Sequence, residues 1–130
     1  MINEVSAGAP ASEAPALGKE SAGARRFGSV IHLRPERAEE YLQLHGAVWP
    51  DVLATIEACN IRNYSIYLHG DLLFSYFEYV GSDYATDMAR MAAAPATQRW
   101  WDICMPCQRQ TEDAVPGEWW TPIPEIFHCD

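Results

Sequence analysis

Tyr41, His45 and Trp49 follow one another at intervals of four residues in the stretch Tyr41–Pro50. On a helix this spacing places Tyr41 and His45 on one face, one turn apart, although Pro50 favours a new helix start beside Trp49. The row would offer a phenol that forms hydrogen bonds, an imidazole that titrates near neutral pH and a flat apolar indole. A small polyhydroxylated ligand such as a sugar needs both hydrogen bonds and an aromatic face.

The same row also has a structural interpretation. His45 could end a helix and bind its last carbonyl groups, while Tyr41 and Trp49 simply fill the core. Spacing alone leaves both interpretations open, so the rest of the chain has to decide between them.

Length and charge limit the class of protein. A chain of 130 residues predicts one domain with a real core. Its net charge of -9 argues against nucleic acid or an anionic membrane as a partner. With 5 Trp and 6 Tyr, the composition suggests an aromatic-lined pocket or interface, and a large core is the alternative that needs no function. No apolar stretch approaches the length of a membrane span, so we expect a cytoplasmic protein.

The four cysteines give no clear metal or redox site. Cys104 and Cys107 have CxxC spacing, but no second CxxC pair accompanies them, and the motif follows a predicted helix rather than a strand. Cys129 beside His128 could complete a zinc set only if the tail folded back. We therefore expect reduced thiols, Cys59 included, and no metal.

The first 24 residues are rich in Ala, Gly, Pro, Ser and Glu. They read as a disordered extension that lacks the features of a signal peptide, and their removal is expected to leave folding and activity unchanged. An ordered domain is expected over residues 25–130.

Within that domain, hydrophobic periodicity and turn residues predict alternating strands and helices. Strands are expected over 27–33, 61–68, 72–80 and 125–128, and helices over 35–45, 50–59, 84–93 and 97–106. The predicted inward side chains of the helices are Val52, Leu53, Ile56, Met88 and Met91, and the predicted cap of the last helix is Thr97. His69-Gly70-Asp71 is expected to be a hairpin turn, and residues 108–115 a loop.

The order strand, helix, strand, strand, helix, strand predicts a ferredoxin-like α+β sandwich. Its strand over 72–80 is almost continuously apolar or aromatic, which is typical of a strand covered on both faces. Because the predicted helices belong on one face, a second copy of the protein is the simplest cover for the other. We therefore expect a homodimer, in which two sandwiches form a dimeric α+β barrel.

Three further positions could carry chemistry. Trp100 and Trp101 point about 100° apart on a helix, so they cannot both lie in one core stripe, and one could line a cavity or an interface. Tyr64 shares a predicted face with Ile66, so its hydroxyl is either buried with a partner or directed at a ligand. Glu78 could be a base, although an ion pair with an arginine (Arg26 or Arg62) is favoured.

Several motifs, taken together, resemble the L-rhamnose mutarotase family. They are Tyr41-x-x-x-His45-x-x-x-Trp49-Pro50, Asn63-Tyr64-Ser65-Ile66-Tyr67, Leu72-Leu73-Phe74 followed by Glu78, Gln98-Arg99-Trp100-Trp101 with Met105-Pro106, and the closing Glu125-Ile126-Phe127-His128. The resemblance implies a dimeric ferredoxin-like enzyme, free of metal and cofactor, that interconverts the α and β anomers of a 6-deoxy-hexopyranose. It places the proton donor at His45 and the sugar contacts at Tyr41, Tyr64, Trp100 and Trp101.

These residue types suit mutarotation, which opens the sugar ring by moving protons and closes it on the other face. A histidine with a pKa near its usual value of about 6.5 would give and take a proton at neutral pH. A tyrosine with a pKa of about 10 would stay neutral and orient the sugar or relay a proton.

Departures from the family affect the identity of the sugar. Gly46-Ala47 stands where a member of the family has Asn-Pro, and Trp119-Trp120 has no clear equivalent there. We expect L-rhamnose as the substrate, with L-fucose as the alternative. Two hypotheses from other classes are a dimeric α+β barrel monooxygenase and a non-catalytic ligand-sensing or assembly domain. A deep, wholly apolar pocket would favour the monooxygenase, and no pocket at all would favour the non-catalytic domain. Polar and stacking groups around a sugar-sized cavity would favour the mutarotase.

Overall fold

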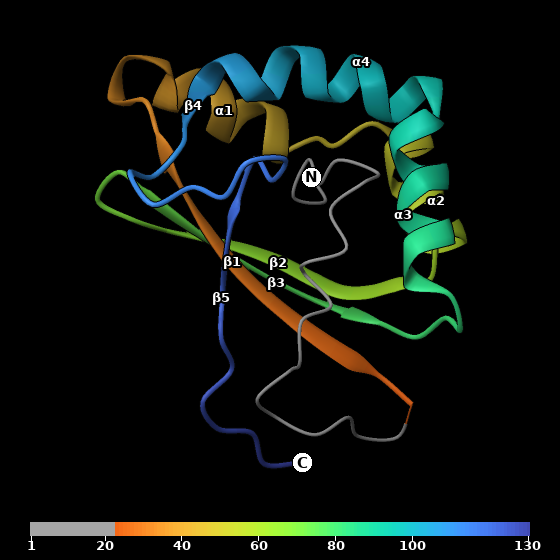
Figure 1. Cartoon of the computed structure of the whole chain (residues 1–130). Helices are drawn as coiled ribbons and strands as arrows, with labels where there is room; N and C mark the ends of the chain where they lie inside the picture. The colour runs from red at the N-terminus through yellow and green to blue at the C-terminus, as the bar shows by residue number, and fades with distance from the viewer. Residues whose placement is uncertain (1–22) are drawn as a thin grey trace.

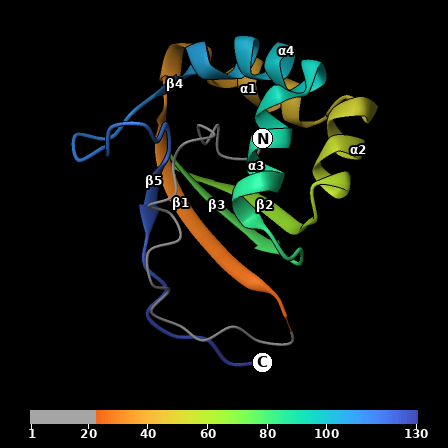
Figure 2. The same cartoon turned by 45° about the vertical axis from the view of Figure 1, so that its right-hand side comes forward.

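Four α-helices lie on the concave side of a curved antiparallel sheet (Figures 1 and 2). The computed structural model describes residues 23–130, so residues 1–22 of the predicted extension lie outside the described residues. Within residues 23–130, no helix is both long enough and apolar enough to cross a membrane.

The central strand of the sheet is β1 (Arg25–Leu33), which pairs antiparallel with β3 on one side and with β4 and β5 on the other. The other strands are β2 (Ile61–His69), β3 (Leu72–Tyr79), β4 (Gln108–Arg109) and β5 (Thr121–Ile123). Their order, β2-β3-β1-β4 with β5 also beside β1, is that of a ferredoxin-like α+β sandwich. The predicted fold class is therefore confirmed.

The C-terminal strand differs from the prediction. Residues 125–128 are not in a strand, whereas Thr121–Ile123 pairs with β1 at Gly28–Val30. Pro124, which has no N–H to donate, follows β5 at once and ends the pairing. After Pro124 the tail is held by the side chain of Glu125, whose Oε1 accepts a hydrogen bond from Nε of Arg26 at 2.9 Å.

Prolines begin two of the helices. The helices are α1 (Ala38–His45), preceded by a 3-10 turn over Pro35–Arg37, α2 (Pro50–Ala58), α3 (Tyr84–Ala93) and α4 (Pro95–Cys104), followed by a 3-10 turn over Met105–Cys107. A proline at the first position of a helix loses no hydrogen bond and has a suitable φ angle. Thr97, predicted as a cap, lies instead inside α4 and is fully buried, so that prediction was wrong.

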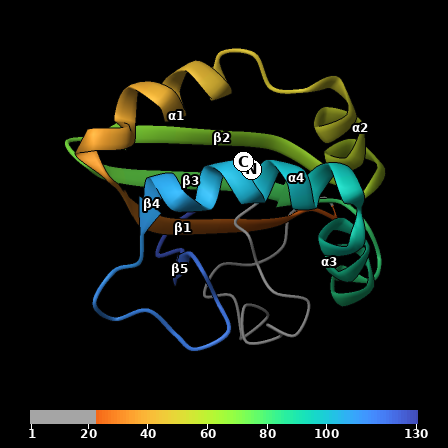
Figure 3. The same cartoon turned by 90° about the horizontal axis from the view of Figure 1, so that it is seen from above.

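The core lies between the concave face of the sheet and the helices. Met88 and Met91 of α3 are buried there, as predicted. Leu53 of α2 is not, because 52% of its surface is exposed. Seen from above, α4 runs along the sheet between α1 on one side and the loop from β4 to β5 on the other (Figure 3).

A β-bulge interrupts the pairing of β2 with β3. Between Arg62 and Ser65 the register shifts, so Asn63 and Tyr64 together face the single residue Phe77. Asn63 has a φ of 50°, in the left-handed region that asparagine tolerates better than most residues. The extra residue changes which side chains face the helices, and Tyr64 turns toward them.

Candidate active site

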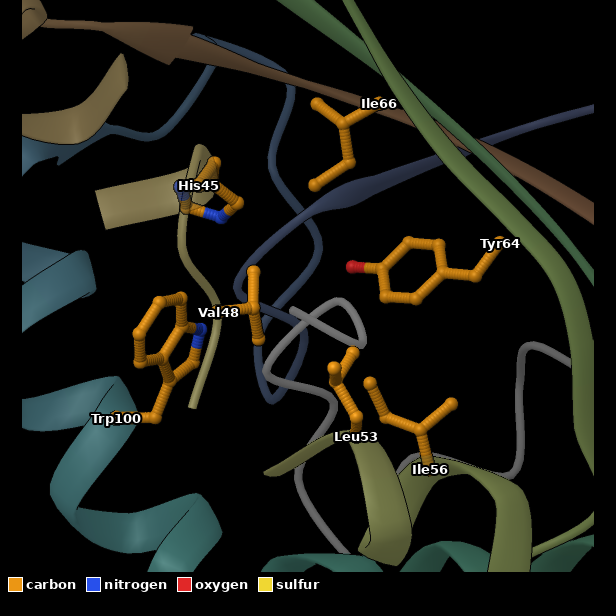
Figure 4. Close-up of a pocket in the computed structure, with 7 residues that line it drawn as sticks. All are labelled: His45, Val48, Leu53, Ile56, Tyr64, Ile66 and Trp100. Atoms are coloured by element: carbon orange, nitrogen blue, oxygen red, sulfur yellow. The ribbon is translucent and has the colours of Figure 1, made fainter. Parts of the chain in front are cut away.

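A pocket of about 290 Å³ lies between the sheet and the helices (Figure 4). This volume is at the small end of the range for ligand pockets and suits a ligand of monosaccharide size. The pocket is lined by one side chain at the end of α1, one from the following loop, two from α2, two from β2 and one from α4: His45, Val48, Leu53, Ile56, Tyr64, Ile66 and Trp100.

His45 is the last residue of α1 and uses its two ring nitrogens differently. Its Nδ1 lies 2.9 Å from the carbonyl oxygen of Tyr41, one turn earlier. A carbonyl oxygen only accepts, so Nδ1 carries the proton and Nε2 holds a lone pair. Nε2 is buried and has no hydrogen-bond partner among residues 23–130. One nitrogen thus binds a helix carbonyl, as the structural interpretation required, while the ring lines the pocket.

Aromatic rings enclose the imidazole. The Tyr41 ring stacks on it with centroids 4.1 Å apart, and the Trp100 ring meets it edge-on at 5.3 Å. The Trp49 ring meets the Trp100 ring edge-on, with centroids 4.9 Å apart. Burial lowers the pKa of His45 from 6.5 to about 4, although the bond to the Tyr41 carbonyl acts in the opposite direction. At neutral pH the imidazole is therefore uncharged.

Tyr64 and Trp100 bring two more polar groups to the pocket. The Tyr64 hydroxyl points from β2 toward the space beside His45 and Trp100 (Figure 4). Trp100 is fully buried, and its indole N–H has no hydrogen-bond partner among the described residues. The remaining lining residues are aliphatic. The pocket therefore has a polar, aromatic side and an aliphatic side.

Tyr41 and Trp101, the other predicted sugar contacts, are not among the described residues that line the pocket. Tyr41 is 2% exposed and lies behind His45, with its hydroxyl oxygen accepting a bond from Gln108. Trp101 is half-buried beside the fully buried Trp100, in keeping with their different directions on the helix. Sugar contact by Tyr41 and Trp101 remains a prediction.

Glu78 lies on the sheet face opposite the pocket. It accepts hydrogen bonds from the Asn63 amide at 2.9 Å and the Tyr76 hydroxyl at 2.7 Å. These bonds hold the pKa of Glu78 below its usual value. Arg26, one of its predicted partners, instead pairs with Glu125. Glu78 is thus fixed away from the pocket.

The cysteines Cys59, Cys104, Cys107 and Cys129 are free thiols. Burial raises the pKa values of Cys59 and Cys107, which favours the neutral thiol. Among residues 23–130, no three His, Cys, Asp or Glu side chains are grouped so as to hold a metal ion.

Sequence analysis missed the aliphatic side of the pocket. It assigned Leu53 and Ile56 to the core, where their spacing on one helix face fits equally well. Their position just after His45 in the chain was the available signal, because the short loop before Pro50 keeps α2 near the end of α1. Gln108, which was assigned to a loop, is 1% exposed and bonds to Tyr41.

Comparisons with known proteins identify the family and agree with the fold. A family model described as L-rhamnose mutarotase matches residues 26–129. The chain is 29% identical over 108 residues to an L-rhamnose mutarotase of Oceanobacillus iheyensis, covering 82% of this chain and 99% of that protein. It is 33% identical over 102 residues to an L-rhamnose mutarotase of Verminephrobacter eiseniae, covering 77% and 92% respectively.

Among solved structures, the crystal structure of L-rhamnose mutarotase FA22100 from Formosa agariphila has the same fold. The TM-score is 0.62 at 19% identity, over 82% of this chain and 99% of that one. The family model covers most of the chain, and the matched region begins within the first strand. The protein therefore belongs to the L-rhamnose mutarotase family and is an isomerase that acts on carbohydrates.

Proposed function

We propose that this protein interconverts the α and β anomers of L-rhamnose, with His45 as the proton carrier. One observation carries the proposal: the uncharged His45 ring lines a sugar-sized pocket together with the Tyr64 hydroxyl and the Trp100 indole. These groups match what the reaction needs, namely a base, a weak acid and a stacking surface.

The chemistry follows from the tautomer of His45. Its Nε2 accepts the proton of the anomeric hydroxyl while the ring oxygen gains a proton from the Tyr64 hydroxyl. The bond between C1 and the ring oxygen breaks, and the anomeric oxygen becomes that of an aldehyde. After rotation about C1–C2, the same steps in reverse close the ring on the other face and return both protons. His45 is thus the base in ring opening and the acid in ring closure.

The aliphatic side of the pocket supports a 6-deoxy sugar as the substrate. Leu53, Ile56 and Ile66 can contact a C6 methyl group, but their side chains offer no hydrogen bond to a C6 hydroxyl. Burying an unpaired hydroxyl costs on the order of 1–3 kcal/mol, or roughly 5- to 150-fold in binding. Tyr41 and Trp101 are included as sugar contacts only on the family resemblance.

Saturation-transfer NMR tests the proposal because it measures anomer exchange directly. L-rhamnose, L-fucose and L-mannose form the panel, and L-mannose differs from L-rhamnose only by its C6 hydroxyl. We expect the protein to accelerate the anomer exchange of L-rhamnose and to accelerate that of L-fucose less. For L-mannose, kcat/KM should be at least about 5-fold lower than for L-rhamnose. No acceleration with any of these sugars would reject the proposal, and preference for L-fucose would reassign the substrate.

The proposed assembly is a homodimer in the cytoplasm. On the sheet face away from the helices, Tyr67 and Phe74 are paired neighbours on β2 and β3, and they are 65% and 37% exposed. In the C-terminal tail, Ile126 and Phe127 are 89% and 79% exposed. These apolar surfaces support a second copy of the chain as the cover for this face.

A further inference from the structure

Trp119 begins a chain of two hydrogen bonds that reaches the candidate active site, the first partly buried and the second buried. Its indole Nε1 donates to Oε1 of Gln108 at 2.7 Å. The amide Nε2 of Gln108 donates in turn to the hydroxyl oxygen of Tyr41 at 3.2 Å. Because an indole N–H can only donate, the oxygen of the Gln108 amide must face Trp119 and its NH₂ must face Tyr41. Trp119 therefore sets the donor-to-acceptor direction of both hydrogen bonds.

Tyr41, at the end of this chain, contacts His45 in two ways. Its ring stacks on the imidazole at 4.1 Å with an interplanar angle of 28°. Its carbonyl oxygen accepts the bond from Nδ1 at 2.9 Å. With Trp100 against the imidazole edge-on, the Tyr41 ring cannot tilt without moving the imidazole or losing the stack. The orientations of the two rings are therefore coupled.

The loop from β4 to β5 holds Trp119 in place. Gln110 Nε2 donates to the backbone oxygens of Glu118 at 2.9 Å and Trp119 at 3.1 Å. Across the base of the loop, the hydroxyls of Thr111 and Thr121 are 2.6 Å apart. These hydrogen bonds join the start of the loop to its end, where Trp119 lies.

We propose that Trp119 is a positioning residue for the reaction. Acting through Gln108 and Tyr41, it holds the His45 ring so that Nε2 faces the pocket. Trp119 is not among the described residues that line the pocket, so it does this without being a lining residue itself. The kinetic consequence rests on the proposed function, whereas the state of the His45 ring can be measured without any sugar.

The first test is Trp119→Phe, which keeps an aromatic ring and removes the N–H. We expect kcat for anomer exchange to fall about 3- to 10-fold while KM stays within about 2-fold, because orientation rather than binding is lost. In ¹⁵N NMR spectra at pH 7 without sugar, the single Nδ1–H tautomer of His45 should give way to a mixture. Trp120→Phe is the matched control, since it makes the same change in the adjacent, buried core residue. It should leave kcat and the His45 spectrum unchanged.

A double-mutant cycle distinguishes an effect of Trp119 through Gln108 and Tyr41 from an unspecific disturbance of the structure. Gln108→Met removes both bonds at similar side-chain length and should lower kcat as much as Trp119→Phe does. Adding Trp119→Phe to Gln108→Met should cause no further loss, because the two residues act through one path. Tyr41→Phe removes only the last oxygen, and Trp119→Phe should have no effect in that background either.

Two results would overturn the inference. One is a Trp119→Phe protein with wild-type kcat and a wild-type His45 spectrum. The other is a double variant whose losses in kcat multiply. Failure of the proposed function is distinguishable, because it would appear as absent anomer exchange in the wild type while the His45 spectra still answered the positioning question. If Trp119→Phe fails to fold, the Gln108→Met and Tyr41→Phe spectra decide.

Discussion

At the scale of single residues, His45 unites the two interpretations that its sequence context left open. Its Nδ1 binds the carbonyl oxygen of Tyr41 within α1, which is a structural role. The same bond fixes the tautomer that makes Nε2 a base, so the structural contact also prepares the chemical one. The family resemblance pointed to His45, but no sequence pattern gives the tautomer, because it depends on which nitrogen meets the carbonyl.

His45→Asn tests the chemical role. Asparagine can still bind the Tyr41 carbonyl but cannot act as a base near neutral pH. We expect the protein to remain folded and the rate of anomer exchange to fall about 10²- to 10⁴-fold. Saturation-transfer NMR measures the rate, and Trp100→Phe is the comparison, because it trims a stacking surface and should chiefly raise KM. Exchange at the wild-type rate in a folded His45→Asn protein would end the role of His45.

The lowered pKa of His45 changes the expected pH dependence. The sequence predicted an inflection near 6.5, whereas burial moves the pKa to about 4. Because the uncharged ring is the active form, the rate should stay constant as pH falls from 7 to 5 and decline as pH passes through about 4. An inflection near 6.5 in the rate profile of wild type would show that the ring is not buried in solution.

The same shift predicts a loss of stability in acid. The unfolded chain takes up a proton at His45 near pH 6.5, and the folded chain does so only near 4. The free energy of unfolding should therefore fall between pH 6.5 and 4, by at most about 3 kcal/mol. Urea titrations of wild type and His45→Asn isolate the effect, since the variant lacks this titrating group and should show a correspondingly smaller fall.

At the scale of elements, the bulge in β2 directs Tyr64 into the pocket. Asn63 adopts the left-handed conformation that the extra residue requires, and its amide also binds Glu78. Asn63→Gly and Asn63→Ala both remove this bond, but only glycine adopts a positive φ without strain. We expect the Ala variant to be less stable than the Gly variant by about 1 kcal/mol in urea unfolding. Equal stability would mean that the bulge is not held by this residue.

The start of α2 was predictable and the last strands were not, for a physical reason. Pro50 favours a helix start by its own φ angle, and α2 begins there. β4 and β5 are only 2 and 3 residues long and are defined by pairing with β1, a partner far away in the sequence. The apolar residues over 125–128 resemble a strand locally, but the pairing with β1 ends before Pro124.

At the scale of the whole molecule, the pocket joins segments that are distant in sequence. His45, Tyr64 and Trp100 come from α1, β2 and α4. The sequence could identify these side chains through family motifs, but it could not show that Tyr41 lies behind the imidazole, because this depends on the contact with Gln108 after α4. These three lining residues were named from the sequence, whereas the arrangement of side chains around the cavity follows from packing.

The proposed dimer follows from the sheet face that the helices leave uncovered. Along β3, the side chains facing the helices are buried, and Phe74, on the other face, is exposed beside Tyr67. Both faces of this strand carry apolar side chains, but within the described chain only the face toward the helices is covered. We expect sedimentation to show a dimer at micromolar concentration.

Phe74→Glu should convert that dimer into a monomer, because a two-fold interface would bury two copies of the new charge without a partner. Leu42→Glu is the matched control: Leu42 lies on α1 and is 53% exposed, so the same kind of change there should leave the dimer intact.

If wild type sediments as a stable, soluble monomer, the sheet face is not a dimer interface. If both variants dissociate the dimer, the contact lies elsewhere or spreads beyond the sheet. Dissociation by Phe74→Glu alone would locate the interface on the face of β2 and β3 opposite the pocket, so that each subunit keeps its own His45 and its own opening for sugar.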